Sequence, residues 1–183
     1  MKVCTFLAEG YDEVEALAVV DVLRRAGIDV KIVSITGEYL VLSSRGVTIK
    51  ADVLFDDIDY SDVDALFMPG GLTGADNFYN YEPLRMLINT FNDEGKRLAA
   101  VCAAPGIYGQ MGLLNGKKAT CYPGFEERLI GATHVKDRVI TDGNITTSRG
   151  MGTSVELGLE LVKLLISEDK ANELAMKIQH ITD

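Results

Sequence analysis

One stretch decides the fold, Lys96–Gly106, which reads KRLAAVCAAPG. An apolar run that ends in Cys102 and continues into small residues, Pro105 and Gly106 is typical of a strand that turns sharply into a helix. Such a turn lifts a side chain clear of the sheet, and the free N–H groups at the helix start favour a thiolate. The alternative is that Cys102 is a small apolar filler, since free cysteine is among the most buried residue types. Position alone leaves both interpretations open.

The segments before this stretch predict a parallel sheet. Strands are expected over Val3–Ala8 and Asp29–Ile35, with a helix over Asp12–Ala26 between them that ends at Gly27. This order of strand, helix and strand is a crossover unit, which implies parallel strands and a right-handed connection. A further buried strand is expected over Val63–Met68, because the turn residues Pro-Gly-Gly follow it.

The remaining elements complete an α/β fold. They are short strands over Glu38–Ser43 and Val47–Phe55, a strand over Arg97–Val101, helices from Pro83 to about Asn92 and from the Cys102 turn to about Leu114, a strand over Lys118–Cys121, a hairpin of Val135–Ile140 and Ile145–Ser148, and helices over Thr153–Ile166 and Lys170–Gln179. Together they predict a three-layer α/β sandwich with a mostly parallel central sheet. Residues 1–183 are expected to form a single domain, because no linker or repeat marks a second one.

Composition and charge exclude several classes of function. The 183 residues are 47% hydrophobic and 25% charged, with a formal net charge of −9. Such a surface offers no positive field to nucleic acid or to an anionic membrane, and no apolar stretch reaches the roughly 20 residues that span a bilayer. The histidines, His134 and His180, lie far apart, so no histidine-rich metal site is expected, and no cofactor is expected either.

The cysteines indicate a reducing compartment. Cys4, Cys102 and Cys121 are an odd number without CxxC spacing, and the apolar start of the chain meets Glu9 too early for a signal-peptide core. We therefore expect a cytoplasmic protein, with Cys4 in the core, whereas the position of Cys121 leaves its role open.

Three segments are expected at one edge of the sheet, because ligands of such sheets bind beyond the carboxyl ends of the strands. They are the loop and helix start that carry Glu15, the pair Gly70-Gly71, and Cys102. Glu15 follows Asp12 by three residues, so one interpretation is a capping box in which the acid binds a free amide of the helix. The other is a carboxyl that shares a proton with the Cys102 sulfur, or that acts as general acid and base on a substrate.

Glycines and arginines supply candidate binding groups. Gly70 and Gly71 allow the backbone to approach a ligand and to aim its N–H groups at an oxyanion, whereas the simpler interpretation is a tight turn. Arg45 is a candidate for binding an anionic or carbonyl group of a substrate, with a solvated turn residue as the alternative. Arg149 has the same two interpretations.

The helix over Asp12–Ala26 also predicts a partner. It is apolar around most of its circumference, interrupted mainly by Asp21. A helix of this kind is covered on more than one side. The sheet covers one face, so a homodimer contact is expected on another. Arg24 and Arg25 at the end of the helix complement its dipole.

Five blocks of sequence, in order and over nearly the whole chain, resemble the ThiJ/PfpI superfamily. They are residues 9–15 (EGYDEVE), 20–27 (VDVLRRAG), 68–71 (MPGG), 100–105 (AVCAAP) and 147–154 (TSRGMGTS). The resemblance implies a flavodoxin-like sandwich that forms a homodimer. It implies a reactive cysteine at the strand-to-helix turn, Cys102, with Glu15 as its partner acid.

The same resemblance implies an oxyanion pocket from Gly70-Gly71 and the amide of Ala103. It places the family's anion-binding arginines at Arg45 and, near the dimer contact, at Arg24 or Arg25. Where several relatives carry a histidine near the cysteine, this chain has Tyr122, so a Cys–His dyad is not expected. The superfamily's proteases carry a histidine directly after the cysteine, and this chain lacks it as well.

Two classes of function follow from the resemblance. One is a cofactor-free cysteine enzyme of the glutathione-independent glyoxalase or protein deglycase type, which converts methylglyoxal or glyoxal to hydroxy acids or removes early glycation adducts from proteins. The alternative is an oxidative-stress sensor or redox-regulated chaperone in which Cys102 is oxidised to a sulfinate that protonated Glu15 stabilises. A third interpretation, a catalytically silent sandwich kept for a protein partner, predicts an unreactive Cys102.

Overall fold

The computed structural model describes residues 1–180, so residues 181–183 of the predicted 1–183 domain lie outside the described residues. Within residues 1–180, seven strands form the central sheet in the order β10-β11-β7-β6-β1-β2-β5. Their bounds are β1 (Lys2–Leu7), β2 (Asp29–Ser34), β5 (Val53–Leu54), β6 (Ala65–Met68), β7 (Arg97–Val101), β10 (Val139–Asp142) and β11 (Ile145–Ser148). All neighbouring strands are parallel except β10, which runs antiparallel to β11. The predicted mostly parallel sheet is confirmed.

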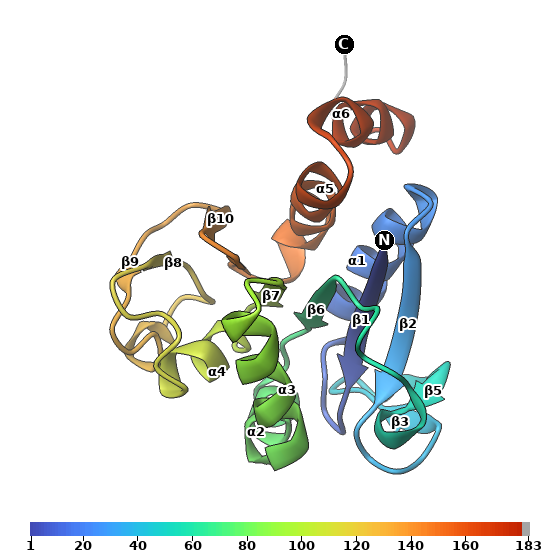
Figure 1. Cartoon of the computed structure of the whole chain (residues 1–183), viewed down its shortest axis with the longest axis vertical. Coiled ribbons are helices and arrows are strands. Elements are labelled where there is room, and N and C mark those ends of the chain that lie inside the picture. The colour runs from blue at the N-terminus through green and yellow to red at the C-terminus, as the bar shows by residue number, and fades with distance from the viewer. Residues whose placement is uncertain (181–183) are drawn as a thin grey trace.

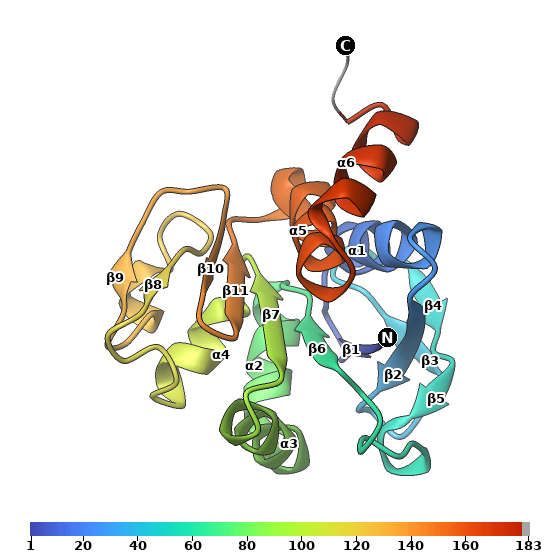
Figure 2. The same ribbon diagram turned by 45° about the horizontal axis from the view of Figure 1, so that its top comes forward.

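Helices cover both faces of this sheet (Figure 2). One layer contains α1 (Glu13–Arg25), α5 (Ser154–Leu165) and α6 (Glu168–Lys177). The other contains α2 (Leu72–Asn80), α3 (Glu82–Asp93) and α4 (Pro105–Gln110). The predicted three-layer α/β sandwich is therefore confirmed. Among residues 1–180 no helix combines the length and the apolar character needed to cross a bilayer.

Short elements lie around the edges of the sheet. They are the antiparallel pair β3 (Leu40–Leu42) and β4 (Thr48–Lys50), the parallel pair β8 (Lys118–Ala119) and β9 (Thr133–His134), and the 3₁₀ turns Phe55–Asp57, Glu126–Arg128 and Met151–Thr153. The pair β8 and β9 lies beside β10, at the opposite end of the sheet from β2 and β5 (Figure 1).

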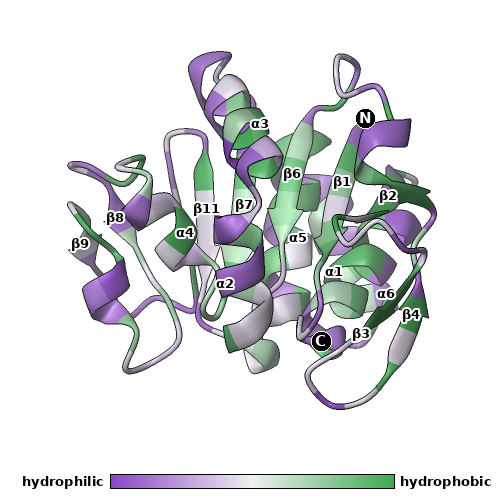
Figure 3. Cartoon of the chain, turned by 90° about the horizontal axis from the view of Figure 1, so that it is seen from below, coloured by the Kyte–Doolittle hydropathy of each residue, from purple (hydrophilic) through white to green (hydrophobic). Residues whose placement is uncertain are grey.

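The core is centred on the middle strands. β6 is buried along its whole length and β1 along nearly all of its length, because helices cover both faces of the sheet there. This is why both strands are predominantly apolar, and both are coloured mainly as hydrophobic in Figure 3. Large side chains complete the packing, among them Tyr11 from the loop before α1 and Tyr108 from α4, which are fully buried.

The structure corrects several predicted boundaries. Helix α2 was not expected, since the glycines before and within it favour a loop. Gly71 has a φ of +85° that suits its position before the helix, and Gly74 packs on the backbone of Tyr11, where a larger residue would not fit. Helix α4 ends at Gln110 rather than near Leu114, because Gly112 adopts a φ of +75°.

The second half of the chain shows two further differences. The hairpin around Asp142-Gly143 is confirmed, but its first strand starts at Val139 rather than Val135. The N–H of Val135 instead donates to the carbonyl of Ala119, which extends the pairing between β8 and β9. Strand β9 itself was not predicted.

Candidate active site

Cys102 lies on a strained turn between β7 and α4. Its φ of +64° is in the left-handed region, which is unfavourable for a residue with a Cβ. Two backbone hydrogen bonds hold it there. The Cys102 N–H donates to the carbonyl of Ser148 at 3.0 Å, and the N–H of Tyr122 donates to the Cys102 carbonyl at 2.9 Å. The surrounding strands thus fix the thiol at the carboxyl edge of the sheet, as the sequence predicts.

Glu15 reaches the same edge from the first turn of α1. Asp12 caps this helix, because its Oδ1 accepts from the N–H groups of Val14 and Glu15 at 3.0 and 3.1 Å. The Glu15 carboxyl does not return to the helix, so the capping box is only half formed. Glu15 is instead 1% exposed, its carboxyl accepts from the N–H of Gly70 at 2.7 Å, and it lies beside the Cys102 thiol, whose pKa it raises.

The Glu15 carboxyl and the Cys102 thiol share surroundings that disfavour a negative charge on either group. Burial raises the pKa of Glu15 to about 7, and the charge of Asp12 acts in the same direction. Burial also raises the pKa of Cys102, as does the neighbouring carboxylate, whereas hydrogen bonds from the N–H groups of Gly71 and Ala103 lower it. When Glu15 holds the proton, the repulsion on the sulfur disappears and these amides favour the thiolate. The ionisation of the two groups is therefore coupled, because a negative charge on one opposes ionisation of the other.

A glycine is needed at position 70 because its backbone lies between Cys102 and the Glu15 carboxyl. A Cβ on Gly70 would lie 2.6 Å from the Cβ of Cys102 and 2.6 Å from Oε2 of Glu15. The structure therefore brings the sequence-predicted residues Cys102, Glu15, Gly70, Gly71 and Ala103 together.

These groups open onto a hollow of about 750 Å³. Its described lining includes Arg45 from the turn between β3 and β4, together with Arg138 and Arg149. Arg45 is thus placed in the hollow, where sequence alone left it open. Tyr122 lines it as well, half exposed and with its ring edge against Phe125. Sequence reasoning missed Arg138, because no motif surrounds it and the hollow forms from distant segments.

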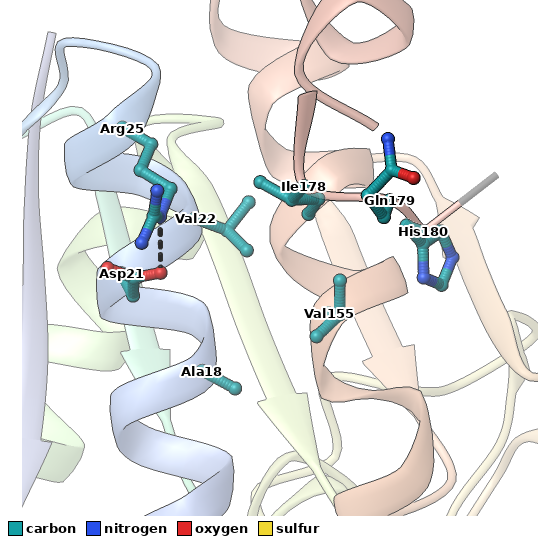
Figure 4. A pocket seen from close by; sticks show the side chains of 8 residues that line it. All are labelled: Ala18, Asp21, Val22, Arg25, Val155, Ile178, Gln179 and His180. Carbon is teal, nitrogen blue, oxygen red and sulfur yellow. Dashed lines mark hydrogen bonds and ion pairs between the residues drawn. The ribbon is translucent and has the colours of Figure 1, made fainter. Parts of the chain in front are cut away.

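Arg24 and Arg25 are not at this site. Arg24 binds Asp52 at 2.7 Å and the carbonyl of Val30, and Arg25 binds Asp21 at 2.6 Å. Arg25 lies beside a separate groove of about 440 Å³ between α1 and the end of α6 (Figure 4). Neither lines the hollow above Cys102, and anion binding by Arg24 or Arg25 near a dimer contact stays a prediction.

The other cysteines are in the core. Cys4 is fully buried in β1 and Cys121 is 1% exposed, and burial raises the pKa of both thiols. Of the chain's three cysteines, all within the described residues, only Cys102 is partly exposed. No group of three or more metal-binding side chains occurs in residues 1–180.

Comparison with known proteins agrees with the fold. "Protein DJ-1 homolog B" of Arabidopsis thaliana is 42% identical over 176 residues, which is 95% of this chain but 40% of that longer protein. A deglycase of Pyrococcus abyssi is 30% identical over 167 residues, covering 90% of this chain and 99% of that protein. The solved structure of oxidized Toxoplasma gondii DJ-1 superposes with a TM-score of 0.93 at 33% identity, covering 97% of both chains. The family model of the DJ-1/PfpI family matches residues 1–164, so the chain belongs to the DJ-1/PfpI family.

Proposed function

We propose that this protein is a cofactor-free cysteine enzyme that converts small 2-oxoaldehydes such as methylglyoxal to 2-hydroxy acids. The observation that carries the proposal is the pair of Cys102 and Glu15, which lie beside each other in an open hollow. A thiol beside a carboxyl with a pKa near 7 suits proton transfer at neutral pH. The similarity to the Pyrococcus abyssi deglycase supports reaction with carbonyl compounds.

The first step joins the thiol to the substrate. The Cys102 sulfur bonds to the aldehyde carbon, and the carbonyl electron pair moves to oxygen, which takes a proton to give a hemithioacetal. The N–H groups of Gly71 and Ala103, which lower the pKa of the thiol, stabilise the negative charge as it moves in this step.

Glu15 then carries out the isomerisation. Its carboxylate removes the proton from the former aldehyde carbon, which gives an enediol, and returns a proton to the adjacent carbon. The product is a 2-hydroxyacyl thioester on Cys102. Water adds to this thioester and releases the hydroxy acid and the thiol, so methylglyoxal and one water give lactate without an oxidant. The same attack on adducts formed by these aldehydes with protein side chains would make the enzyme a deglycase.

Lactate formation from methylglyoxal without glutathione tests this proposal. Cys102→Ser and Glu15→Gln should each lower kcat/KM by at least about 10²-fold, because each removes a group that acts on the reacting atoms. Cys4→Ala is the matched control, since it removes a buried cysteine away from the hollow. Turnover that survives in either site variant would contradict the mechanism.

A second function, oxidative-stress sensing, is favoured by one specific observation. Only Cys102 among the cysteines is partly exposed, and a protonated Glu15 beside it can donate a hydrogen bond to a sulfinate. A structural relative has been solved in an oxidized form. Mild peroxide should then oxidise Cys102 selectively, and mass spectrometry that finds equal oxidation of Cys4 and Cys121 would exclude the sensor.

We also propose that the protein acts as a homodimer through α1. Val14 and Leu17 are exposed on this helix although both are apolar. The hairpin of β3 and β4, with exposed Leu42 and Val47, is hydrogen bonded to the loop before α1. Apolar side chains on adjacent elements are typical of a surface that a second subunit covers.

A further inference from the structure

The hollow above Cys102 has an apolar lining that the conversion of methylglyoxal does not use. Its large apolar side chains are Leu72, Tyr122, Phe125 and Met151. Phe125 is partly buried against the core, and the other three are about half exposed. They come from three separate segments of the chain, so no single element accounts for their meeting. Methylglyoxal has one methyl group, which leaves most of this apolar surface without a role.

Tyr122 is held next to the residue that carries the thiol. Its N–H donates to the carbonyl of Cys102 at 2.9 Å. Its ring meets that of Phe125 edge to face, with the ring centroids 6.1 Å apart. The ring also packs on Gly150, where a Cβ would lie 3.2 Å from its Cδ2. These contacts fix the ring in place, and because Tyr122 lines the hollow, its exposed surface is available to a ligand.

The charged groups around the hollow offset each other. Within residues 1–180, three arginines line it. The carboxyls of Asp12 and Glu15 line it as well, and Glu156 binds one of the arginines, Arg138, at 2.7 Å. The formal charges therefore balance, which gives a charged substrate tail no overall advantage. An apolar tail, in contrast, gains by leaving water wherever apolar side chains receive it.

We propose that the substrate is a 2-oxoaldehyde with a branched or aromatic apolar tail, which lies against Tyr122 while the aldehyde carbon meets Cys102. This inference rests on the proposed function and names its substrate class. The hollow of about 750 Å³ has room for a chain longer than three-carbon methylglyoxal. Each methylene that leaves water adds to binding, so the larger substrate is held more tightly. Tyr122 is then a residue that determines specificity and does not touch the reacting atoms.

The chemistry of such a substrate needs no further reagent. For 4-methyl-2-oxopentanal, the sulfur bonds to the aldehyde carbon, Glu15 moves one proton from that carbon to its neighbour, and water hydrolyses the thioester. The product is 2-hydroxy-4-methylpentanoate. The isobutyl tail takes no part in bond making, so it contributes only binding and orientation.

Alkylation of Cys102 tests this contact without any turnover. Iodoacetamide and N-benzyliodoacetamide are both uncharged and react through the same group, so their rate constants depend equally on the fraction of thiolate. The ratio of the benzyl rate constant to the plain one, divided by the same ratio for free glutathione, should be roughly fivefold, because the benzyl group leaves water against a partly exposed lining. Peptide mass spectrometry separates Cys102 from the buried cysteines, and added salt should leave the ratio unchanged.

Three variants identify the side chain that makes the contact. Tyr122→Ala should lower the ratio to near that of glutathione, whereas Tyr122→Phe should keep it, because the ring and not the hydroxyl receives the benzyl group. Tyr39→Ala is the matched control and should also keep it, since Tyr39 is a similarly exposed tyrosine that does not line the hollow.

Two outcomes of this experiment overturn the inference. One is a wild-type ratio at or below that of glutathione, as expected if a second subunit covers the apolar lining. The other is a Tyr122→Phe or Tyr39→Ala protein that loses the preference as fully as Tyr122→Ala does.

Turnover then tests the substrate class. Wild-type kcat/KM should be about fivefold higher for 4-methyl-2-oxopentanal than for methylglyoxal. A wild type without a preference for the larger substrate overturns the assignment. Absence of turnover on both substrates rejects the proposed function, and the alkylation ratio still decides whether the lining receives an apolar group.

The split between kcat and KM separates specificity from catalysis. Tyr122→Ala should raise KM for 4-methyl-2-oxopentanal about fivefold and leave kcat for both substrates close to that of the wild type, because the tail binds equally in the ground state and in the transition state. An equal loss of kcat on both substrates would place the Tyr122 hydroxyl in the reaction itself and overturn its role in specificity.

Discussion

Glu15 lies in surroundings that resist its charge. Its carboxyl is 1% exposed and receives a single backbone N–H, so burial resists its negative charge. The pKa of this group is therefore raised, from its usual 4.5 to about 7. A carboxyl kept near neutrality beside a thiol is what the proposed proton transfers require.

The same shift predicts how stability depends on pH. The neutral carboxyl contributes stability that is fully present below about pH 4.5 and is lost as the pH rises through about 7, since the unfolded chain ionises first. Glu15→Gln keeps an acceptor for Gly70 and removes the charge. This substitution should raise the free energy of unfolding by about 2 kcal/mol over the wild type at pH 8, and should leave it unchanged near pH 4.5.

Urea unfolding at the two pH values measures this difference. Glu38→Gln, at an exposed position, should change neither value. A Glu15→Gln protein that is less stable than the wild type at pH 8 would show that the charged carboxylate stabilises the fold.

At the scale of elements, the packing of α1 on α5 depends on Gly158. A Cβ at this position would lie 2.8 Å from the Cβ of Val22 and 2.9 Å from its Cγ1. Val22 is buried and β-branched, so its side chain has little freedom to move aside. The glycine therefore lets the two helices approach closely.

Gly158→Ala should consequently destabilise the protein. Alanine favours a helix by about 1 kcal/mol over glycine, but overpacking here costs about 1–3 kcal/mol, so a net loss of about 1 kcal/mol is expected. The double variant Gly158→Ala with Val22→Ala should lose less than the sum of the two single changes, because the smaller side chain makes room. Chemical unfolding of the four proteins checks this, and a Gly158→Ala protein more stable than the wild type would rule out the close contact.

At the scale of the whole molecule, the apolar surface around α1 predicts the oligomeric state. Leu17→Glu places a charge in the proposed interface and should convert a dimer into a monomer of 19.9 kDa, as measured by light scattering. Met86→Glu is the control, since Met86 is exposed on α3 in the opposite helix layer. A wild type that is monomeric, or a Leu17→Glu protein that remains dimeric, would exclude this interface.

Some features of the molecule follow from local sequence alone. The alternation of apolar strands with capped helices predicts the parallel sheet. Asp12 and Gly27 mark the ends of α1, and the run up to Cys102 followed by Pro105 predicts the turn that carries the thiol. These signals are local because backbone conformation and capping depend on residues close together in the chain. The unpredicted helix α2 shows the limit, since its glycines are explained by a contact with the distant Tyr11.

Only the tertiary structure decided which side chains meet. Sequence allowed the Glu15 carboxyl either to cap its own helix or to face the thiol, and the N–H of Gly70, fifty-five positions away, binds it at the sheet edge. Arg45 and Arg138 likewise line one hollow although they are far apart in the chain. Local propensity carries no information on such distances. The packing of helices on a sheet fixes them, and with them the chemistry of the site.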